Sequence, residues 1–569
     1  MSRVRLLENT EPEIHGSSNT LVVVLHGMGK KSIDWCDAIR EGLPDADLLV
    51  PQFNSNIFSN VDPRRIADQL AQYIQEAYAN RSKRLNGSYE NIILIGYSAG
   101  GLIIRKTYLI AMGYGDDEKL IRHSKPLPWT NKVERIILIA SINRGISDAK
   151  PEHMNWLMHM FQKIGWVIVP LLGLGKFVCN LRQGSPFVAN LRVQWIRLSQ
   201  ASGIQLPQTI QLPQTIQLLG DLDDVVAEED NVDVLADTNF RYIKLRDTGH
   251  YSICDFKEPN VGSHRKEKFL KALITPTNLL EGDQISNMNE IGQQKDHVVF
   301  IMHGIRDMGL WTIRISETIE DVAQQLGQSV ESITSGYGYF PMLRFLLLGS
   351  RQVNVRWFMD LYTEAIARYP NAKVSFIGHS NGTYLLAGAL KRYHACKIHH
   401  VAFAGSVVPK NYPWDILVRQ GRVKAIRNDI ASADWVVGIF PGFFELLKFS
   451  DIGTAGHNGF QDNAPKDNSF DQYFQGDHGA AIQPQNHSSL AKFILTGEKV
   501  TPEKGLLVSE QNKAIVFWAK QCWAVWIAIA VIICIFGYLL TWLLSALGVS
   551  LLLAWFIYIS LVLILLYTL

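Results

Sequence analysis

NIILIGYSAGG, at residues 91–101, places an apolar run directly before the pattern G-x-S-x-G. The run predicts a buried strand, and the pattern predicts a sharp turn from that strand into a helix. At such a turn the serine hydroxyl is exposed, and the next backbone N–H faces the same space. Ser98 is therefore a candidate nucleophile.

The same pattern occurs again as VSFIGHSNGTY at residues 374–384, which makes Ser380 a second candidate nucleophile. In each half an apolar run ending in His-Gly lies about 70–80 residues before the serine, with His26 in the first half and His303 in the second. One G-x-S-x-G is weak evidence in a chain with 43 glycines, but two copies in the same context indicate chemistry. We therefore expect a duplicated fold.

Short apolar runs alternate with helix-like stretches throughout both halves. This alternation predicts an α/β fold, in which each half forms a doubly wound, mostly parallel sheet. The runs and the helix-like stretch are LVVVLHG (21–27), IADQLAQYIQEAYAN (66–80) and RIILIASINRG (135–145), then VVFIMHG (298–304) and HHVAFAGSVVP (399–409).

The domain organisation follows from where these patterns stop. We expect one α/β domain over residues 1–275, a polar linker over 276–295, a second α/β domain over 296–510 and a membrane hairpin over 511–569. A local repeat, QLPQTIQLPQTIQ at 205–217, is interpreted as loop expansion without chemistry of its own.

Composition excludes several classes of function. A formal net charge of +2 gives no reason to expect nucleic acid as a partner. The six cysteines include no C-x-x-C pair, which argues against a disulfide framework or a zinc site and suits a reducing compartment. The N-terminus lacks the apolar core of a signal peptide, so we do not expect export by the ordinary secretory route.

The last 49 residues, 521–569, contain no Asp, Glu, Lys or Arg. As one helix they would be about 74 Å long, against roughly 30 Å for a bilayer core. A break near Ser545–Ser550, at Gly548, would give two transmembrane helices of about 22 residues. Lys513 and Lys520 precede the first span and favour a cytoplasmic side for the catalytic domains. The alternative is an apolar hairpin buried inside the protein.

A serine nucleophile needs an imidazole base and a carboxylate that orients it. After this kind of turn the chain order is serine, then acid, then histidine. Aligning D-D-V-V of the first half with D-W-V-V of the second puts Asp223 in register with Asp434. We expect these two as the orienting carboxylates, with Asp224 as the alternative in the first half.

The bases should follow these acids in the chain. His250, in TGHYSIC, lies 27 residues after Asp223, and His478, in GDHGAAIQP, lies 44 residues after Asp434. We expect both histidines to act as bases, and His487, in QNHSSL, is the alternative in the second half.

Backbone N–H groups should bind the oxyanion that forms during acyl transfer. The glycine after each His26 or His303 lets the strand end bend, so that the next N–H points at the serine. The expected donors are Met28 and Ala99 in the first half, and Ile305 and Asn381 in the second. We interpret His26 and His303 as structural, because they precede the nucleophile.

Taken together, these motifs resemble the α/β-hydrolase superfamily, and GYSAGGLIIR in the first half is similar to the G-H-S-M-G-G-L-x-x-R pattern of its lipase-type members. The segment ASINRG at 140–145 resembles their A-T-P-x-x-G. The resemblance implies an eight-stranded, mostly parallel sheet and hydrolysis of esters or thioesters through an acyl-enzyme, without a cofactor or metal. The second half departs from the pattern at Thr383 and at GSVVP (405–409).

The sequence therefore predicts an integral membrane serine hydrolase of the lipase, phospholipase or esterase type, whose partners are a lipid bilayer and a lipid or other acyl ester. The apolar segment 435–449, directly after Asp434, is either a lipid-facing lid or acyl channel, or a core helix. The alternative function is a membrane scaffold or sensor in which one or both domains are inactive. Neither the ester nor the oligomeric state can be predicted.

Overall fold

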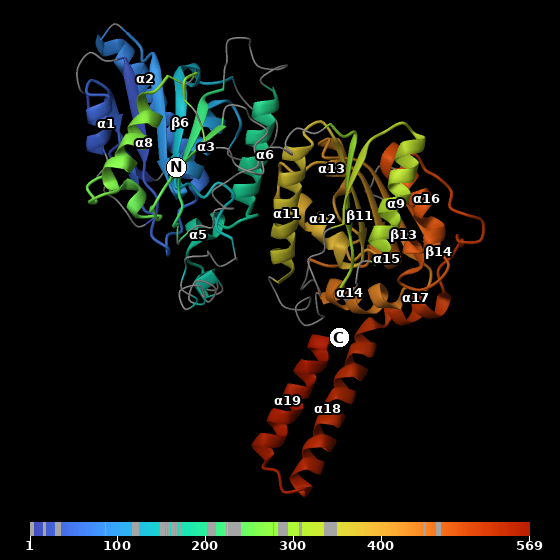
Figure 1. Cartoon of the computed structure of the whole chain (residues 1–569). Helices are drawn as coiled ribbons and strands as arrows, with labels where there is room; N and C mark the ends of the chain where they lie inside the picture. The colour runs from blue at the N-terminus through green and yellow to red at the C-terminus, as the bar shows by residue number, and fades with distance from the viewer. Residues whose placement is uncertain are drawn as a thin grey trace. The chain divides into compact units, whose positions relative to one another are not determined.

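Figure 1 shows the computed structural model of the chain. The structure describes residues 5–14, 19–28, 36–85, 87–115, 125–147, 172–201, 212–223, 225, 240–276, 278–280, 282, 294–305, 310–334, 350–447, 451–461 and 468–568, and also 154, 156, 160, 165, 166 and 168–170. The chain forms two compact units. Unit 1 is Met1–Gln293 with Met359–Pro370 and Tyr393–Ala395, and unit 2 is Gln294–Phe358, Asn371–Arg392 and Cys396–Leu569.

Unit 1 contains a six-stranded parallel sheet with the order β3-β2-β5-β6-β7-β8. Its strands are β2 (Thr20–Leu25), β3 (Asp47–Leu49), β5 (Asn91–Tyr97), β6 (Val133–Ile139), β7 (Gln214–Gly220) and β8 (Phe240–Leu245). A separate antiparallel pair joins β1 (Leu7–Glu8) to β4 (Gln52–Phe53). The strands predicted from LVVVLHG, NIILIGY and RIILIAS are confirmed as β2, β5 and β6.

Helices cover both faces of this sheet (Figure 1). One face packs on α1 (Cys36–Gly42) and α8 (Gly262–Ile274), where Ile39 and Phe269 join the buried strand residues Ile95 and Ile137. Buried strand residues with helices on both sides explain why the strands are apolar along their whole length. The remaining helices of unit 1 in the described residues are α2 (Pro63–Leu85), α3 (Ala99–Ala111), α5 (Lys176–Asn180), α6 (Pro186–Ala201) and the 3-10 turns Pro128–Lys132 and Ser252–Cys254.

The interpretation of the 205–217 repeat as a loop is wrong for its second copy. Residues 214–217 open β7, and Ile216 lies in the core with no exposed surface. The β-branched Thr215 and Ile216 suit a strand between two neighbours, and Gln217 is satisfied there by Asn143 Nδ2, 3.1 Å away. The first copy, at 205–210, lies outside the described residues.

Unit 2 contains a second six-stranded parallel sheet, with the order β10-β9-β11-β12-β13-β14. Its strands are β9 (His297–Met302), β10 (Val330–Ile333), β11 (Lys373–His379), β12 (Ile398–Ala404), β13 (Val423–Ala431) and β14 (Ser469–Phe474). One face packs on α9 (Leu310–Gln325) and α16 (Pro484–Thr496). The other described helices are α11 (Ser350–Arg368), whose residues from Met359 onward are counted with unit 1, α12 (Asn381–Arg392), α13 (Trp414–Arg419), α14 (Trp435–Leu447), α15 (Ala455–Asn458) and the 3-10 turn Ala480–Ile482.

The two sheets have the same topology. If the strands of each sheet are numbered along the chain, their order across the sheet is 2-1-3-4-5-6. The direction of winding therefore reverses between the first and third strands. In such sheets ligands bind at the carboxyl ends of the strands at this reversal point. The expectation of eight strands is wrong for the described residues, where each main sheet has six and the additional short strands of unit 1 pair separately.

Three helices end the chain: α17 (Lys513–Lys520), α18 (Cys522–Ala546) and α19 (Leu551–Thr568). With 25 residues, α18 is long and apolar enough to cross a membrane by length and composition. The chain turns at Gly548, where φ is +85°, as predicted for this break. α19 then lies beside α18 (Figure 1), with Tyr558 Oη donating to Ile533 O at 2.8 Å. α19 is shorter than α18, with 18 residues.

Candidate active site

Ser98 occupies the tight turn between β5 and α3, with φ 52° and ψ −121°. The two glycines of the motif are required by close backbone contacts. A Cβ at Gly96 would lie 2.6 Å from Gly101 Cα, and one at Gly100 would lie 2.5 Å from Leu25 O. The helix can therefore begin immediately after the strand and hold the serine at the carboxyl edge of the sheet.

Unit 2 builds the same turn between β11 and α12. Ser380 also has φ 52°, and a Cβ at Gly378 or Gly382 would run into neighbouring backbone. Thr383 stands where the first half has Gly101, the glycine that follows the motif. Its Oγ1 donates to Ser380 O at 2.7 Å and accepts from Val407 N at 3.1 Å. This departure from the lipase-type pattern therefore leaves the turn intact.

In unit 1 the structure brings Ser98, His250 and Asp223 into one hydrogen-bonded chain. His250 Nε2 lies 3.1 Å from Ser98 Oγ, and His250 Nδ1 lies 2.9 Å from Asp223 Oδ2. All three residues are buried to at least nine-tenths. With Nδ1 protonated toward the carboxylate, Nε2 is left as an acceptor aimed at the serine hydroxyl. This is the relation that a nucleophile and its general base require.

Four further residues that the sequence did not single out hold His250 in place. Asp221 Oδ1 accepts from Thr248 N at 3.0 Å, which ties the loop of the acid to the loop of the histidine. Buried Arg265 donates to Thr248 Oγ1 at 3.0 Å. Tyr97 Oη donates to His250 O at 2.9 Å. The sequence does not indicate these contacts, because Tyr97 occupies the variable position of its motif and Arg265 belongs to no motif.

In unit 2 the structure brings His478 to Asp434 but not to Ser380. His478 Nδ1 lies 2.8 Å from Asp434 Oδ2, which is fully buried. Among the described residues, no hydrogen bond joins the ring of His478 to Ser380 Oγ. The ring lies instead against the end of β12, where a Cβ at Gly405 would be 2.7 Å from His478 Cε1 and 2.8 Å from Nδ1.

Two more histidines approach this second site. The ring of His379, which precedes Ser380, lies 4.8 Å from the ring of His478, and its Nε2 lies 3.3 Å from His478 O. His457, on α15, is almost fully buried beside Asp434. Burial lowers the pKa of His457, although the Asp434 carboxylate favours its protonated form. The sequence indicates neither role, because His379 stands in the variable position of its motif and TAGHNGF predicts a loop around His457, where the structure has the short helix α15.

The alternative acid and histidine, and the histidine interpreted as structural, do not join the hydrogen-bonded groups described above. Asp224 lies outside the described residues. His487 is on α16, where its Nε2 lies 3.0 Å from Ile482 O, and the contact with Asp434 is made by His478. His26 Nε2 accepts from Phe53 N at 3.1 Å, which leaves its other nitrogen to donate to Gly27 O at 2.7 Å. Both nitrogens of the His26 ring are therefore used in hydrogen bonds that fix the chain at the end of β2.

Each expected oxyanion donor is adjacent in sequence either to the serine or to a glycine that lies against it. A Cβ at Gly27 would be 2.7 Å from Ser98 Cβ, so the chain after β2 passes the nucleophile one residue before Met28. Ala99 is the first residue of α3, where a backbone N–H has no acceptor within the helix. Unit 2 repeats this arrangement, with Gly304 against Ser380 before Ile305, and Asn381 as the first residue of α12.

A cleft of about 850 Å³ opens in unit 1 beside residues that adjoin this site, and its lining includes neither Ser98 nor His250. Met28 and Tyr251 line it, and these residues are an expected oxyanion donor and the neighbour of His250. Ile57 and Val61 add apolar wall, while Asn54 and the rest of its segment add polar groups. The cleft is large enough for an acyl ester and its leaving group.

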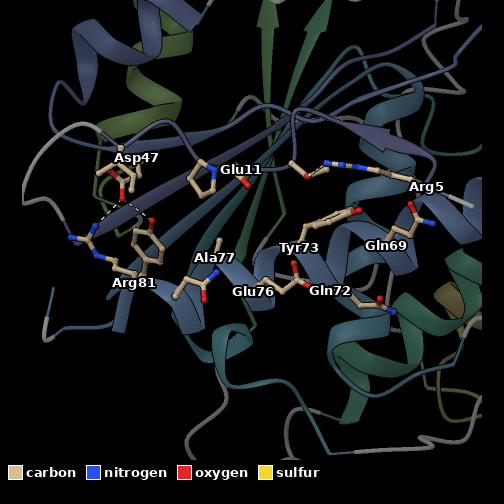
Figure 2. Close-up of a pocket in the computed structure, with 14 residues that line it drawn as sticks. Arg5, Glu11, Asp47, Gln69, Gln72, Tyr73, Glu76, Ala77 and Arg81 are labelled. Atoms are coloured by element: carbon tan, nitrogen blue, oxygen red, sulfur yellow. Dashed lines mark hydrogen bonds and ion pairs between the residues drawn. The ribbon is translucent and has the colours of Figure 1, made fainter. Parts of the chain in front are cut away.

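Figure 2 shows a different hollow in unit 1, of about 430 Å³, which contains none of the predicted site residues. Several of its lining residues are joined by polar contacts. Asp47 Oδ2 lies 2.8 Å from Arg81 Nη1 and 2.6 Å from Tyr89 Oη. Leu6 N, beside the lining residue Arg5, donates to Gln69 Oε1 of α2 at 2.9 Å. These contacts tie α2 to β3 and to the N-terminal segment, so we interpret the hollow as structural. In the part of the chain that the structure describes, no group of three or more His, Cys, Asp or Glu could hold a metal ion.

The strand order and the two turns define an α/β protein with two six-stranded parallel sheets. No protein-family model and no curated protein sequence matches this chain. Among solved structures, it is similar to esterase PE8 at 16% identity and a TM-score of 0.25, over 47% of this chain and 97% of that one.

Two further solved structures are similar to the chain. One is the NocB thioesterase domain, at 15% identity and a TM-score of 0.25, over 48% of this chain and 100% of that one. The other is an esterase from Rhizomucor miehei, at 13% identity and a TM-score of 0.29, over 47% of this chain and 77% of that one. Each match extends over about half of this chain.

Proposed function

We propose that this protein is a serine hydrolase of the α/β-hydrolase type that cleaves carboxylic ester or thioester bonds, with Ser98, His250 and Asp223 as its principal triad. The observation that carries this proposal is the chain of two hydrogen bonds, 3.1 Å and 2.9 Å long, from Ser98 Oγ through His250 to Asp223. The proposal is also supported by the position of Ser98 at the carboxyl end of β5, where the winding of the sheet reverses.

In this mechanism, Ser98 Oγ attacks the carbonyl carbon while its proton passes to His250 Nε2. The carbonyl oxygen becomes an oxyanion that accepts hydrogen bonds from the N–H groups of Met28 and Ala99. Collapse of this intermediate breaks the bond to the alcohol or thiol, which leaves with the proton from His250. Asp223 stays ionised and stabilises the imidazolium. Water then attacks the acyl-serine by the same steps and regenerates Ser98.

We further propose that α18, with α19 beside it, anchors the protein in a bilayer as a transmembrane hairpin. The 25 residues of α18 would span about 37 Å, enough for a bilayer core of roughly 30 Å. Lys513 and Lys520 before it favour a cytoplasmic location for both units. Lipids and other acyl esters at that membrane are the substrates that this anchor favours.

A regulatory or scaffolding role for unit 2 is the second candidate, and one observation favours it. His478 contacts Asp434 but makes no hydrogen bond to Ser380 among the described residues. A site in which the base does not touch the nucleophile would react slowly or require a rearrangement.

Labelling of the detergent-solubilised protein with a fluorophosphonate tests these proposals, since the reagent reacts with an activated serine. Wild type is compared with Ser98→Ala, Ser380→Ala and the double variant. Labelling lost only with Ser98→Ala assigns catalysis to unit 1, and equal partial losses assign it to both. No labelling of folded wild type contradicts the hydrolase and leaves the scaffold.

A further inference from the structure

The acid of unit 2 is joined directly to an apolar helix. α14 begins at Trp435, one residue after Asp434, and Asp434 Oδ1 accepts from Val437 N at 2.9 Å. This bond caps the first turn of α14 with the carboxylate that also holds His478. A displacement of α14 would therefore also move the Asp434 carboxylate and, through it, His478.

The other side of α14 packs on the start of α18. The rings of Phe440, Phe443 and Phe444 surround Trp526, with centroid distances of 5.4, 5.2 and 5.9 Å. Trp526 lies in the second turn of α18, at the end where the helix leaves unit 2 (Figure 1). Four aromatic rings thus connect the loop of the acid to the helix proposed to enter the membrane.

α17 is fixed to the same place. Asn512, at its N-cap, donates its backbone N–H to Ser432 O at 2.9 Å, within the loop that carries Asp434. The side-chain amide of Gln511 donates to the carbonyl of His457. A Cβ at Gly438 of α14 would lie only 3.0 Å from Ala519 Cβ, so the two helices are in close contact. α14, α17 and the start of α18 therefore form one assembly beside the site.

This assembly exposes large apolar side chains that a water-facing surface would not need. They are 47–59% exposed and lie on all three helices; we call them the apolar collar: Trp435, Leu446, Leu447, Phe517, Trp518 and Trp523. Exposed apolar patches of this kind mark sites that bind a partner or a membrane. The collar is continuous with the apolar surface of α18.

Charge at the collar points to lipid. Lys513 and Lys520 stand at the two ends of α17, with Phe517 and Trp518 between them. Aromatic rings with flanking lysines are typical of the bilayer interface, where the rings enter the headgroup region and the ammonium groups meet phosphates. A basic flank also favours anionic lipids.

We infer that the apolar collar lies in the interface of the bilayer that α18 enters, and that the Ser380 site takes a water-insoluble acyl lipid directly from that leaflet. This rests on the proposed function, because it presupposes that Ser380 is a nucleophile and that α18 is an anchor. The bilayer would also press on α14, and through its first turn on Asp434 and His478.

The test uses the full-length protein with Ser98→Ala, which leaves Ser380 as the only candidate nucleophile. The protein is reconstituted in phosphatidylcholine vesicles with or without phosphatidylglycerol. Two rates are measured: hydrolysis of a long-chain fluorogenic diacylglycerol held in the vesicles, and hydrolysis of water-soluble p-nitrophenyl acetate. Their ratio reports access to substrate from the bilayer.

Phe517→Glu with Trp518→Glu should lower this ratio about tenfold, because two apolar side chains that would enter the bilayer interface are replaced by charged ones. Phe517→Leu with Trp518→Phe should keep the ratio within about twofold, since the collar stays apolar. Ile313→Glu with Ile416→Glu, at exposed positions on α9 and α13, is the matched control and should leave the ratio unchanged. Lys513→Gln with Lys520→Gln should remove the preference for phosphatidylglycerol.

An unchanged ratio in the double glutamate variant overturns the inference. So does a fall of the same size in the leucine and phenylalanine variant, which would indicate damaged packing. If the detergent-solubilised protein is a dimer that the glutamate variant dissociates, the collar binds a second copy and the inference is wrong. Failure of the proposed function looks different: neither ester is hydrolysed, and Ser380 takes up no fluorophosphonate.

Discussion

The two sites differ in the position of one ring, although their sheets and turns are alike. In unit 1 the imidazole of His250 reaches Ser98, and in unit 2 the imidazole of His478 lies against Gly405. Ala140 is the equivalent of Gly405 at the end of the neighbouring strand, and both have positive φ, 44° and 53°. Ala140 has a methyl group at the position where Gly405 has none. A Cβ is therefore present at this position in the unit whose histidine contacts the serine, and absent in the unit whose histidine does not.

The largest expected effect comes from removing the nucleophiles in turn. Ser98→Ala should reduce hydrolysis of a water-soluble ester by a factor on the order of 10⁴ or more, because the residual rate comes from binding and the oxyanion donors alone. Ser380→Ala should leave most of that rate. Steady-state kinetics with p-nitrophenyl butyrate measures both.

The comparison requires that both variants remain folded. Ser98 and Ser380 are each more than nine-tenths buried, and alanine has nearly the same size, so far-ultraviolet circular dichroism should match wild type. A Ser98→Ala protein that keeps its full rate would show that the hydrogen-bonded chain in unit 1 is not the active site.

A second difference between the units concerns acid stability. His297, at the start of β9, is fully buried, and burial, aided by Lys373 and His400, lowers its pKa to about 4. Between pH 6.5 and 4 the unfolded chain therefore binds a proton that the folded chain refuses, so stability falls as pH falls through this window. His297 alone would account for up to about 3 kcal/mol.

The equivalent position in unit 1 is Thr20, since each residue pairs with the first residue of the next strand, Asn91 or Lys373. His297→Thr should therefore flatten the pH dependence of unfolding. Urea unfolding at pH 7.5, 6 and 5 measures this. Burial also lowers the pKa of His399 and His400, so part of the slope should remain. An unaltered slope would mean that His297 does not titrate in this range.

Exchanging the residues at the strand ends tests the comparison of the two rings directly. A methyl group at Gly405 would overlap the ring of His478, which must then move, and φ of +53° is close to the value that Ala140 already tolerates. In a Ser98→Ala background, Gly405→Ala should raise the rate of fluorophosphonate labelling of Ser380 roughly tenfold, as a base approaches the hydroxyl. Ala140→Gly should slow the labelling of Ser98.

Opposite changes in the two units would make this position the determinant of base placement. If Gly405→Ala slows labelling instead, the ring of His478 has no room near Ser380, and unit 2 is a regulatory or scaffolding unit. Thermal unfolding of both variants separates these results from a loss of folding.

The smallest expected effect on the rate comes from Tyr97, the residue before Ser98. Tyr97→Phe removes the hydrogen bond from Oη to His250 O, 2.9 Å long, and should lower kcat about threefold with little change in KM. Its pH profile should stay the same, because the hydroxyl contacts the main chain and not the ring. A shifted profile would assign Tyr97 a part in the proton transfer itself.

Local sequence was sufficient for the framework of the fold. An apolar run before G-x-S-x-G specifies a strand, a turn and a helix within eleven residues, and both copies form them. The search for the acids and histidines could be limited to residues after each serine, because the chain order after this kind of turn is serine, acid, histidine. Alignment of D-D-V-V with D-W-V-V selected the acids that each contact a histidine, Asp223 and Asp434.

Contacts between distant segments could not be predicted. Nothing in the sequence shows that Gly405 leaves room for His478, that Asp221 supports Thr248, or that Trp526 packs among three phenylalanines of α14. Each depends on where a side chain points after the sheet has formed. The repeat was misread for the opposite reason: its Pro and Gln residues suggest a loop, while burial between β6 and β8 makes it a strand.

The backbone of the two serines has a consequence for the free energy of folding. A non-glycine residue with φ near 52° is strained by about 1 kcal/mol or more, and glycine would relieve it. Ser98→Gly and Ser380→Gly should therefore melt at a higher temperature than wild type while losing their nucleophiles. If only the free energy of folding mattered, glycine would be favoured at both positions. The serine at each position therefore lowers the stability of the protein.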